Sequence, residues 1–224
     1  TYPNSRQMKT KLLIMALLAC LHVECQTFDA SSIRMYWKDS KGIPYMTFER
    51  LLKTNKNIAF ITGVGKFSGA FSSIGLFIEN GQLLHPIKTV QNTKVNREIQ
   101  PCGVFHINAS GAFIDPLQSK QAYKNAIWAI QSGPMLLIDG RINAALPNRT
   151  KALRNGVGIK KDGKVYFACI EASMREFAEH FQKEGCLNAL MLESDHPDVW
   201  YNGNSRKKFN RFGPMIVAEK SNGK

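Results

Sequence analysis

Short apolar runs that end in glycine-containing turns recur through most of this 224-residue chain. Runs of this length, bounded by turn residues, are typical of β-strands, whereas helices need longer segments with a helical period. Residues 156–159 and 164–170 show the pattern most clearly, because the turn Lys161-Asp162-Gly163 separates them. Strands joined by so tight a turn pair in antiparallel fashion. The chain is therefore constrained to a fold of short, largely antiparallel strands.

Two segments have a helical pattern instead. In residues 173–183 apolar side chains recur at helical spacing, and Ser173 with Glu176 predicts a capping box. Residues 47–53 fit a second short helix, and residues 120–125 fit a third helical turn. With no linker to divide it, the chain is expected to form one α+β domain of mixed, largely antiparallel strands with two or three helices. The predicted strands are residues 29–37, 57–62, 74–78, 82–84, 103–107, 112–114, 128–131, 135–138, 156–159, 164–170, 189–192 and 214–217.

The first 25 residues have the character of a targeting segment. Lys9 and Lys11 precede an apolar run at residues 12–21, which is too short to span a bilayer. We therefore expect residues 1–25 to be an N-terminal extension plus a signal peptide, and residues 26–224 to be the folded domain. This predicts an exported protein, periplasmic or extracellular.

A rival processing site lies inside the same segment. The sequence Leu17-Leu18-Ala19-Cys20 fits a lipoprotein cleavage site, with Cys20 as the lipidated residue that would anchor the chain to a membrane. Cleavage before Gln26 instead would leave three cysteines in the mature chain, and an odd number argues against a disulfide framework. Both processing sites stay open at this point.

The basic charge of the chain suggests anionic partners. The formal net charge is +13, and removal of residues 1–25, which carry three basic residues and one acidic residue, still leaves +11. Phosphates, acidic polymers and membrane surfaces all fit such a charge. The basic residues are scattered and no nucleic-acid-binding motif is present, so we expect no nucleic acid partner.

One pair of segments has the character of an anion-binding site. The turn Ser132-Gly133-Pro134 separates two apolar runs, and the pair Arg154-Asn155 opens another glycine-containing strand. Backbone amides near glycine, together with a guanidinium group, suit a phosphate-like ligand. The plainer interpretation is that these residues form only turns and a strand-end salt bridge from Arg154 to Asp139 or Glu171.

The same segments resemble the phosphodiester glycosidase family, in its bacterial exported branch. Residues 71–81, 129–140, 154–159 and 185–192 carry the resemblance, and their order and spacing agree with the family. Its animal members are of the uncovering-enzyme type, which removes N-acetylglucosamine from a sugar phosphodiester. The resemblance implies the family's α+β fold and a sugar phosphate or phosphodiester-containing glycan as the partner.

The resemblance also implies a set of site residues. The substrate-binding positions are Ser132, Gly133, Pro134, Arg154, Asn155, Gly63, Gly65 and Cys102, and the catalytic carboxylates are Glu193 and Asp195. Three of these motifs are altered. Gly63 and Cys102 stand where family members have Asn, and Glu193 stands where they have the Asp of Asp-Gly.

The alterations bear on turnover. Loss of a glycosyl group from phosphate passes through an oxocarbenium-like state that needs a nearby carboxylate, with less acid help because phosphate leaves readily. Glu193 carries one more methylene than Asp, and a misplacement of ~1 Å can cost on the order of a hundredfold in rate. Cys102 fits a pocket-lining thiol better than a nucleophile, because no base is spaced to activate it. We expect no cofactor, and the isolated triplet His196-Pro197-Asp198 does not make a metal site.

Two functions are therefore expected from the sequence. The chain is an exported phosphodiester glycosidase with a modified pocket, or it is a catalytically impaired relative that binds an anionic glycan or a protein.

Overall fold

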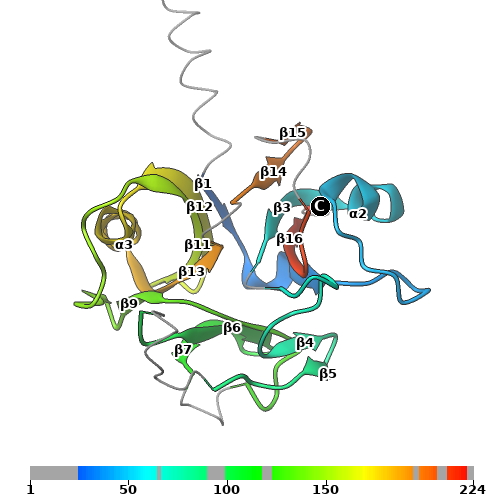
Figure 1. The fold of residues 1–224 in the computed structure, drawn as a ribbon, viewed down its shortest axis with the longest axis horizontal. Coiled ribbons are helices and arrows are strands. Elements are labelled where there is room, and N and C mark those ends of the chain that lie inside the picture. The colour runs from blue at the N-terminus through cyan, green and yellow to red at the C-terminus, as the bar shows by residue number, and fades with distance from the viewer. Residues whose placement is uncertain are drawn as a thin grey trace, which may run out of the picture.

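The computed structural model describes residues 25–64, 67–89, 99–117, 123–193, 197–205 and 211–220, with Glu193 defined by its backbone only. Within these residues, three antiparallel sheets surround one central core, and two α-helices flank them (Figure 1). The fold class predicted from the sequence, a single α+β domain of short and largely antiparallel strands, is confirmed. No helix in the described ranges is long and apolar enough to cross a membrane. Residues 1–24 of the predicted signal segment, which include Cys20, lie outside the described residues, whereas Cys25 is the first residue of β1.

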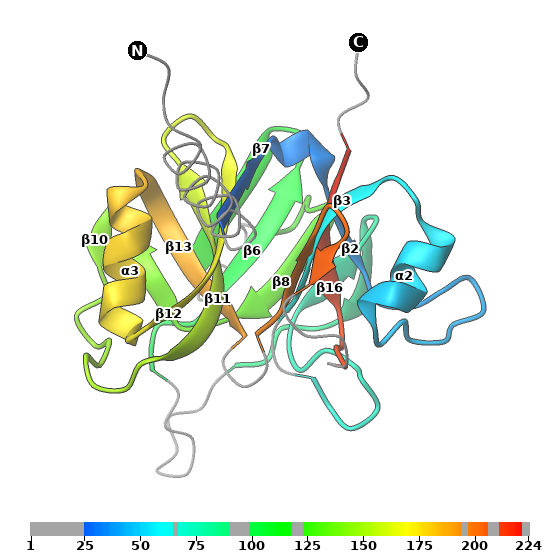
Figure 2. The ribbon, with the colours of Figure 1, turned by 90° about the horizontal axis from the view of Figure 1, so that it is seen from above.

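Sheet A is the largest sheet and curves around a helix. Its strand order is β1 (Cys25–Phe28), β12 (Val165–Ala172), β11 (Ala152–Lys160), β13 (Cys186–Glu193), β9 (Met135–Ile138) and β10 (Arg141–Ile142). Helix α3 (Met174–Lys183) lies in the concave side of this sheet (Figure 2). Phe177 and Phe181 of α3 pack closely on Gly156 and Gly158 of β11, where a larger side chain would meet their rings. The glycines of β11 therefore let the helix approach the sheet.

Sheet B combines strands from both ends of the described chain. Its order is β15 (Asn204–Ser205), β14 (Val199–Tyr201), β3 (Ile58–Gly63), β16 (Met215–Glu219) and β2 (Ile33–Tyr36). Helix α2 (Phe48–Thr54) covers its outer side, where Phe48 stacks on Phe212 with ring centroids 4.5 Å apart. Because β16 pairs with both β2 and β3, the C-terminal strand lies between two strands from the N-terminal part of the chain.

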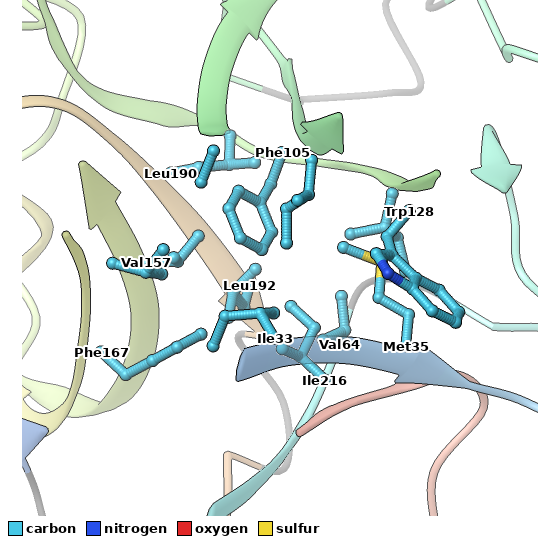
Figure 3. Packing of buried hydrophobic residues seen from close by; sticks show 14 of the residues in the cluster. Ile33, Met35, Val64, Phe105, Trp128, Val157, Phe167, Leu190, Leu192 and Ile216 are labelled. Atoms are coloured by element: carbon cyan, nitrogen blue, oxygen red, sulfur yellow. The ribbon is translucent and has the colours of Figure 1, made fainter. Parts of the chain in front are cut away.

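Sheet C completes the fold. Its order is β5 (Gln82–His85), β4 (Phe77–Glu79), β8 (Trp128–Ser132), β6 (Gly103–Asn108) and β7 (Gly111–Pro116). The inner faces of all three sheets meet in one hydrophobic core (Figure 3). Leu190 from sheet A, Phe105 from sheet C and Ile216 from sheet B are each fully buried there. Burial of one such side chain contributes about 1.5–3 kcal/mol, so the core fixes the sheets relative to one another.

Two features of the N-terminal and middle segments differ from the sequence predictions. The predicted strand at residues 29–37 begins too early, because Ser32 N donates to the carbonyl of Asp29 at 3.0 Å in a turn and only Ile33–Tyr36 form β2, while β1 was not predicted. The strands on either side of this turn, β1 and β2, join different sheets. Residues 123–125 form a turn rather than a helix, and the rest of the predicted helical turn at 120–125 lies outside the described residues.

The other differences lie at strand ends and edges. Strand β13 begins at Cys186, three residues before the predicted strand. The short strands β10, β14 and β15 were not predicted, because they are only two or three residues long and carry no periodic pattern. Both predicted helices are confirmed within one residue, and Ser173 and Glu176 form the expected capping box.

Candidate functional site at the junction of three sheets

Four strands from all three sheets come together at one place, three of them with their C-terminal ends. Asn155 of β11 donates from Nδ2 to Thr62 Oγ1 at 2.9 Å and to the carbonyl of Gly63 at 3.1 Å, which connects sheet A to β3 of sheet B. Ser132 at the end of β8 donates from Oγ to the carbonyls of Met191 at 2.8 Å and Leu192 at 3.0 Å, which connects sheet C to β13. We call this place the junction and define it by Thr62, Gly63, Cys102, Ser132–Pro134, Asn155 and the backbone of residues 191–193.

Asn155 is the most unusual polar group of the junction. Its side chain is 1% exposed, yet Oδ1 has no hydrogen-bond partner within the described structure. A buried acceptor without a donor costs about 1–3 kcal/mol. Native proteins keep few such groups, and those that persist call for an explanation such as a catalytic or ligand-binding role. The amide therefore presents an unmatched acceptor at the junction, suited to a hydroxyl or other donor of a ligand.

The Ser-Gly-Pro turn is held firmly against the neighbouring strand. Pro134 accepts from the backbone N–H of Met191 at 3.0 Å, in addition to the two hydrogen bonds from Ser132. A Cβ at Gly133 would lie 2.8 Å from Cys102 Sγ and 3.1 Å from Cys102 Cα. Glycine is therefore required for the close approach of the turn to Cys102. The predicted positions Ser132, Gly133, Pro134 and Cys102 are brought together by this packing.

Gly63 shows a similar close approach on the other side of the junction. The ring of Phe212 occupies the space that a Cβ on Gly63 would need, so only glycine fits between this ring and Asn155. The neighbouring Thr62 is 1% exposed and also donates from Oγ1 to the carbonyl of Asp198 at 3.2 Å. Thr62 and the buried Asp198 were missed by the sequence analysis. Thr62 is the end of an apolar run, and nothing in the sequence separates it from an ordinary strand residue.

Arg154 lies apart from the other predicted binding residues. Successive strand residues point to opposite faces, and Arg154 lies on the α3 side of sheet A, whereas Asn155 lies on the junction side. Its guanidinium donates from Nε to the carbonyl of Ala172 at 2.9 Å and from Nη2 to the carbonyl of Thr150 at 3.1 Å. Burial lowers the pKa of this guanidinium. Among the described residues no carboxylate forms an ion pair with Arg154, so the alternative of a salt bridge to Asp139 or Glu171 is not seen either.

The structure gives a partial account of the predicted carboxylates. The backbone of Glu193 pairs with Asn155, so residue 193 lies at the edge of the junction, while its side chain is not described. Asp195 and Gly65 lie outside the described residues. The catalytic role of Glu193 or Asp195 therefore stays a prediction. Within the described residues, His, Cys, Asp and Glu side chains nowhere form a group of three that could hold a metal ion.

Comparison with known proteins places these motifs in a family. The model of the phosphodiester glycosidase family matches residues 54–193, which include all of the junction. An uncharacterized protein of Escherichia coli strain K12, YigE, is 32% identical over 140 residues. That match covers 60% of this chain and 55% of the relative, so it spans just over half of the relative's length.

Two solved structures share the fold. The catalytic domain of zebrafish N-acetylglucosamine-1-phosphodiester alpha-N-acetylglucosaminidase, auto-inhibited by its pro-peptide, superposes with a TM-score of 0.59 at 14% identity, over 91% of this chain and 90% of that one. A hypothetical protein from Synechocystis superposes with a TM-score of 0.56 at 13% identity, over 86% of this chain and 58% of that one. Because the family model matches well over half of the sequence, the chain belongs to the phosphodiester glycosidase family.

Proposed function

We propose that the chain hydrolyses a glycosyl phosphodiester that binds at the junction. The observation that carries the proposal is the meeting of separate family motifs around Asn155. Gly63 and the backbone of Glu193 contact this buried asparagine, and the Ser132–Pro134 turn, with Cys102 packed on it, binds β13 at the two residues before Glu193. Oδ1 of Asn155 lacks a donor, and a sugar hydroxyl supplies one.

The chemistry follows from the leaving group. The bond between the anomeric carbon and the phosphate oxygen breaks, the phosphate leaves as a monoester with the bonding electron pair, and water adds to the sugar. A carboxylate near the anomeric carbon stabilises the positive charge that develops on the sugar ring. Residue 193 pairs with Asn155, so a carboxylate from Glu193 or from Asp195 close behind it is the group we assign to this role.

Binding without turnover is the second candidate, favoured by one specific observation. Cys102 stands where family members carry Asn, and its thiol packs within 2.8 Å of the position of a Cβ on Gly133. A thiol is a much weaker hydrogen-bond donor than a side-chain amide. By the family resemblance, the junction therefore lacks an amide that would bind a ligand hydroxyl, while the Ser132–Pro134 turn and Asn155 are kept.

A panel of sugar phosphodiesters separates the two functions. Purified wild type is compared with Glu193→Gln and Asp195→Asn, and Asp162→Asn in the exposed turn between β11 and β12 serves as the matched control. We expect hydrolysis by wild type and by the control, and a loss of at least a hundredfold in kcat in one of the two carboxamide variants. Full activity in both variants would remove these carboxylates from the mechanism. Binding of a diester without any hydrolysis would establish the second candidate.

A separate variant tests Arg154. Its guanidinium lies on the α3 side of sheet A, whereas a residue that binds the phosphate is expected on the junction side. Arg154→Ala is measured for diester KM and for thermal stability. We expect a lower Tm with little change in KM, since the guanidinium binds the carbonyls of Ala172 and Thr150. A large rise in KM at unchanged Tm would instead assign the guanidinium to the ligand.

We also propose that the protein is exported and acts on phosphodiester-containing glycans of the envelope or the extracellular space. The basic start and short apolar run of the N-terminal segment support export, and the net charge of +13 suits anionic glycans. Cleavage before Gln26 would leave three of the four residues of β1 paired with β12. The intact mass of the protein recovered from the periplasm or medium tests this. A mass that starts at Gln26 supports the proposal, a diacylglyceryl-Cys20 mass indicates a lipoprotein, and an uncut cytoplasmic chain refutes export.

A further inference from the structure

A pair of phenylalanines lies on the loop that leaves the junction. Phe67 and Phe71 are stacked, with ring centroids 5.8 Å apart and ring planes inclined by 23°. Both side chains are only half-buried. Because neither ring is fully buried, part of the stacked pair stays accessible to a ligand.

The loop that carries this pair is held rigidly. Phe71 has a φ of +57°, a left-handed conformation that is rare for a bulky residue. Its carbonyl accepts from Trp37 Nε1 at 2.7 Å, and its N–H donates to the carbonyl of Ser68 at 2.8 Å. Ser68 N in turn donates to the carbonyl of Ser72 at 2.9 Å. A strained backbone that the surroundings enforce is common at binding sites, where it fixes the position of a contact residue.

The pair lies next to the junction. A Cβ on Gly213 would meet Phe67 Cβ at 2.6 Å and the carbonyl oxygen of Phe71 at 3.2 Å, so both residues pack on Gly213. The preceding Phe212 packs in the same way on Gly63, whose carbonyl binds Asn155. Phe67 is four positions after Gly63, so the Cα atoms of the two residues are at most about 14 Å apart. The phenylalanine pair is therefore close enough to the junction to be contacted by a ligand that extends beyond one sugar.

Polar groups border the aromatic pair. Ser72 Oγ and His85 Nε2 lie 2.8 Å apart and are both half-buried. His85 packs on Trp37 with ring centroids 5.2 Å apart, and Lys38 Nζ lies 3.7 Å from the centroid of the Trp37 ring. An apolar face bordered by hydroxyl, imidazole and ammonium groups matches a pyranose ring, which has an apolar C–H face and hydroxyls around its edge.

We infer that Phe67 and Phe71 form a carbohydrate subsite, which stacks on a pyranose ring, with Ser72 and His85 binding its hydroxyls. The subsite holds a sugar next to the phosphodiester at the junction. Its role in the reaction rests on the proposed function, but its affinity for a pyranose does not. It makes a diester of two sugars a better substrate than a diester of one sugar and methanol.

Saturation-transfer NMR with phosphate-free probes tests the subsite without reference to hydrolysis. Methyl glycosides of glucose, mannose and N-acetylglucosamine are mixed with wild type, Phe71→Ala, Phe71→Trp and Phe113→Ala. Phe113 on β7 is the matched control, because it is 38% exposed and lies at the opposite edge of sheet C from β5, which carries His85. We expect saturation of the pyranose C–H protons by wild type, Phe71→Trp and Phe113→Ala, with a fall of roughly five- to tenfold in Phe71→Ala. Equal signals in all four proteins, or none with wild type, would overturn the inference.

Steady-state kinetics then tests the link to the junction. With a sugar-to-sugar diester, Phe71→Ala is expected to raise KM roughly five- to tenfold at unchanged kcat, whereas KM for the methyl diester stays unchanged. An equal effect on both diesters would overturn the assignment of the subsite to the second sugar. If no diester is hydrolysed, the proposed function fails, while the NMR result still decides the subsite. Melting temperatures of each variant exclude loss of folding as the cause of lost binding.

Discussion

At the scale of single residues, two buried asparagines show the difference between a structural and a functional polar group. Asn143 uses its whole amide: Nδ2 donates to the carbonyls of Gln100 and Met135, each at 3.0 Å, and Oδ1 accepts from Ala145 N at 3.0 Å. Asn155 leaves Oδ1 without a donor. An asparagine side chain therefore stabilises the fold at position 143, whereas at position 155 its unmatched oxygen lowers the stability of the fold.

Substitution by leucine is expected to separate these roles. Asn143→Leu leaves three backbone groups without partners and should lower the free energy of unfolding by about 2–4 kcal/mol. Asn155→Leu removes the unmatched acceptor but also the donor to Thr62 Oγ1 and the Gly63 carbonyl, so it should lower the free energy of unfolding by only about 1–2 kcal/mol, while diester binding is lost. Urea unfolding and calorimetric titration measure the two effects. A strongly destabilised Asn155→Leu would show that this amide serves the fold.

Glu79 is expected to make stability depend on pH. Burial raises its pKa to about 7, against opposing effects of the Trp37 backbone N–H and the Lys38 charge. The folded protein therefore binds a proton more tightly than the unfolded chain, whose carboxyl has its ordinary pKa of 4.5. The stabilising contribution is complete below pH 4.5 and is lost as the pH rises through about 7.

The variant Glu79→Gln should accordingly match wild type at low pH and exceed it at pH 8. Because the carboxyl is partly screened by solvent, we expect a gain of at most about 1 kcal/mol, or roughly 2–4 °C in Tm. Thermal melts across the pH range measure it, and Glu179→Gln on the exposed side of α3 is the control. A constant difference between Glu79→Gln and wild type at all pH values would contradict the assigned pKa.

The sequence predicted the site residues to different degrees. Ser132 and Asn155 were predicted through the family resemblance, and both contact the end of β13, Ser132 at Met191 and Leu192 and Asn155 at Glu193. The separation of Arg154 from Asn155 was available from the two-residue period of a strand, which sends neighbouring side chains to opposite faces. Thr62 was not predictable, because its contact with Asn155 joins residues 93 positions apart in sequence.

At the scale of elements, local pattern decided what could be predicted. Helix α3 and the β11–β12 hairpin depend on periodicity, caps and turn residues within a short window, and both were predicted. Strand β1 was not, because its four residues, Cys25–Phe28, show neither an alternating nor a continuous apolar pattern.

The N-cap of α3, the helix that packs on sheet A, is expected to contribute to the free energy of unfolding. Ser173 Oγ accepts from Glu176 N at 3.2 Å and donates to Asn148 Oδ1 at 2.6 Å, while Glu176 accepts from the Ser173 N–H at 2.8 Å. Ser173→Ala should lower the free energy of unfolding by about 1–2 kcal/mol. Ser173→Thr, which keeps the hydroxyl, should recover most of it. Denaturant titration compares the three proteins, and an unchanged midpoint for the alanine variant would contradict this role of the cap.

At the scale of the whole molecule, the region that matches the family model is not a complete structural unit. Residues 54–193 include β3, but its two partners β14 and β16 lie beyond residue 193. Ile216 and Met215 of β16 pair with Thr62 and Gly63, the residues that bind Asn155. The C-terminal strand therefore positions the junction without contributing a motif to it.

A polypeptide limited to residues 54–193 is accordingly expected not to fold cooperatively. Its β3 would lack both neighbours, and the inner faces of sheets A and C would lose their cover from β2 and β16. Circular dichroism and amide-proton NMR dispersion, compared with residues 25–224, measure this. A sharp melting transition and dispersed amide signals from the shorter chain would show that sheet B is dispensable.

The two faces of β11 also limit what a motif match can say about activity. Arg154 ties the strand to the carbonyls of Ala172 and Thr150, and a Cβ on Gly156 would lie 3.0 Å from both Leu190 O and Phe177 Cε1. Two residues of the Arg-Asn-Gly triplet therefore serve the packing of α3, and only Asn155 faces the junction. In a descendant that had lost all turnover, Arg154 and Gly156 would still be conserved, because their replacement would destabilise the fold. Within such a lineage, the asparagine alone would report whether the pocket is still under selection for its ligand.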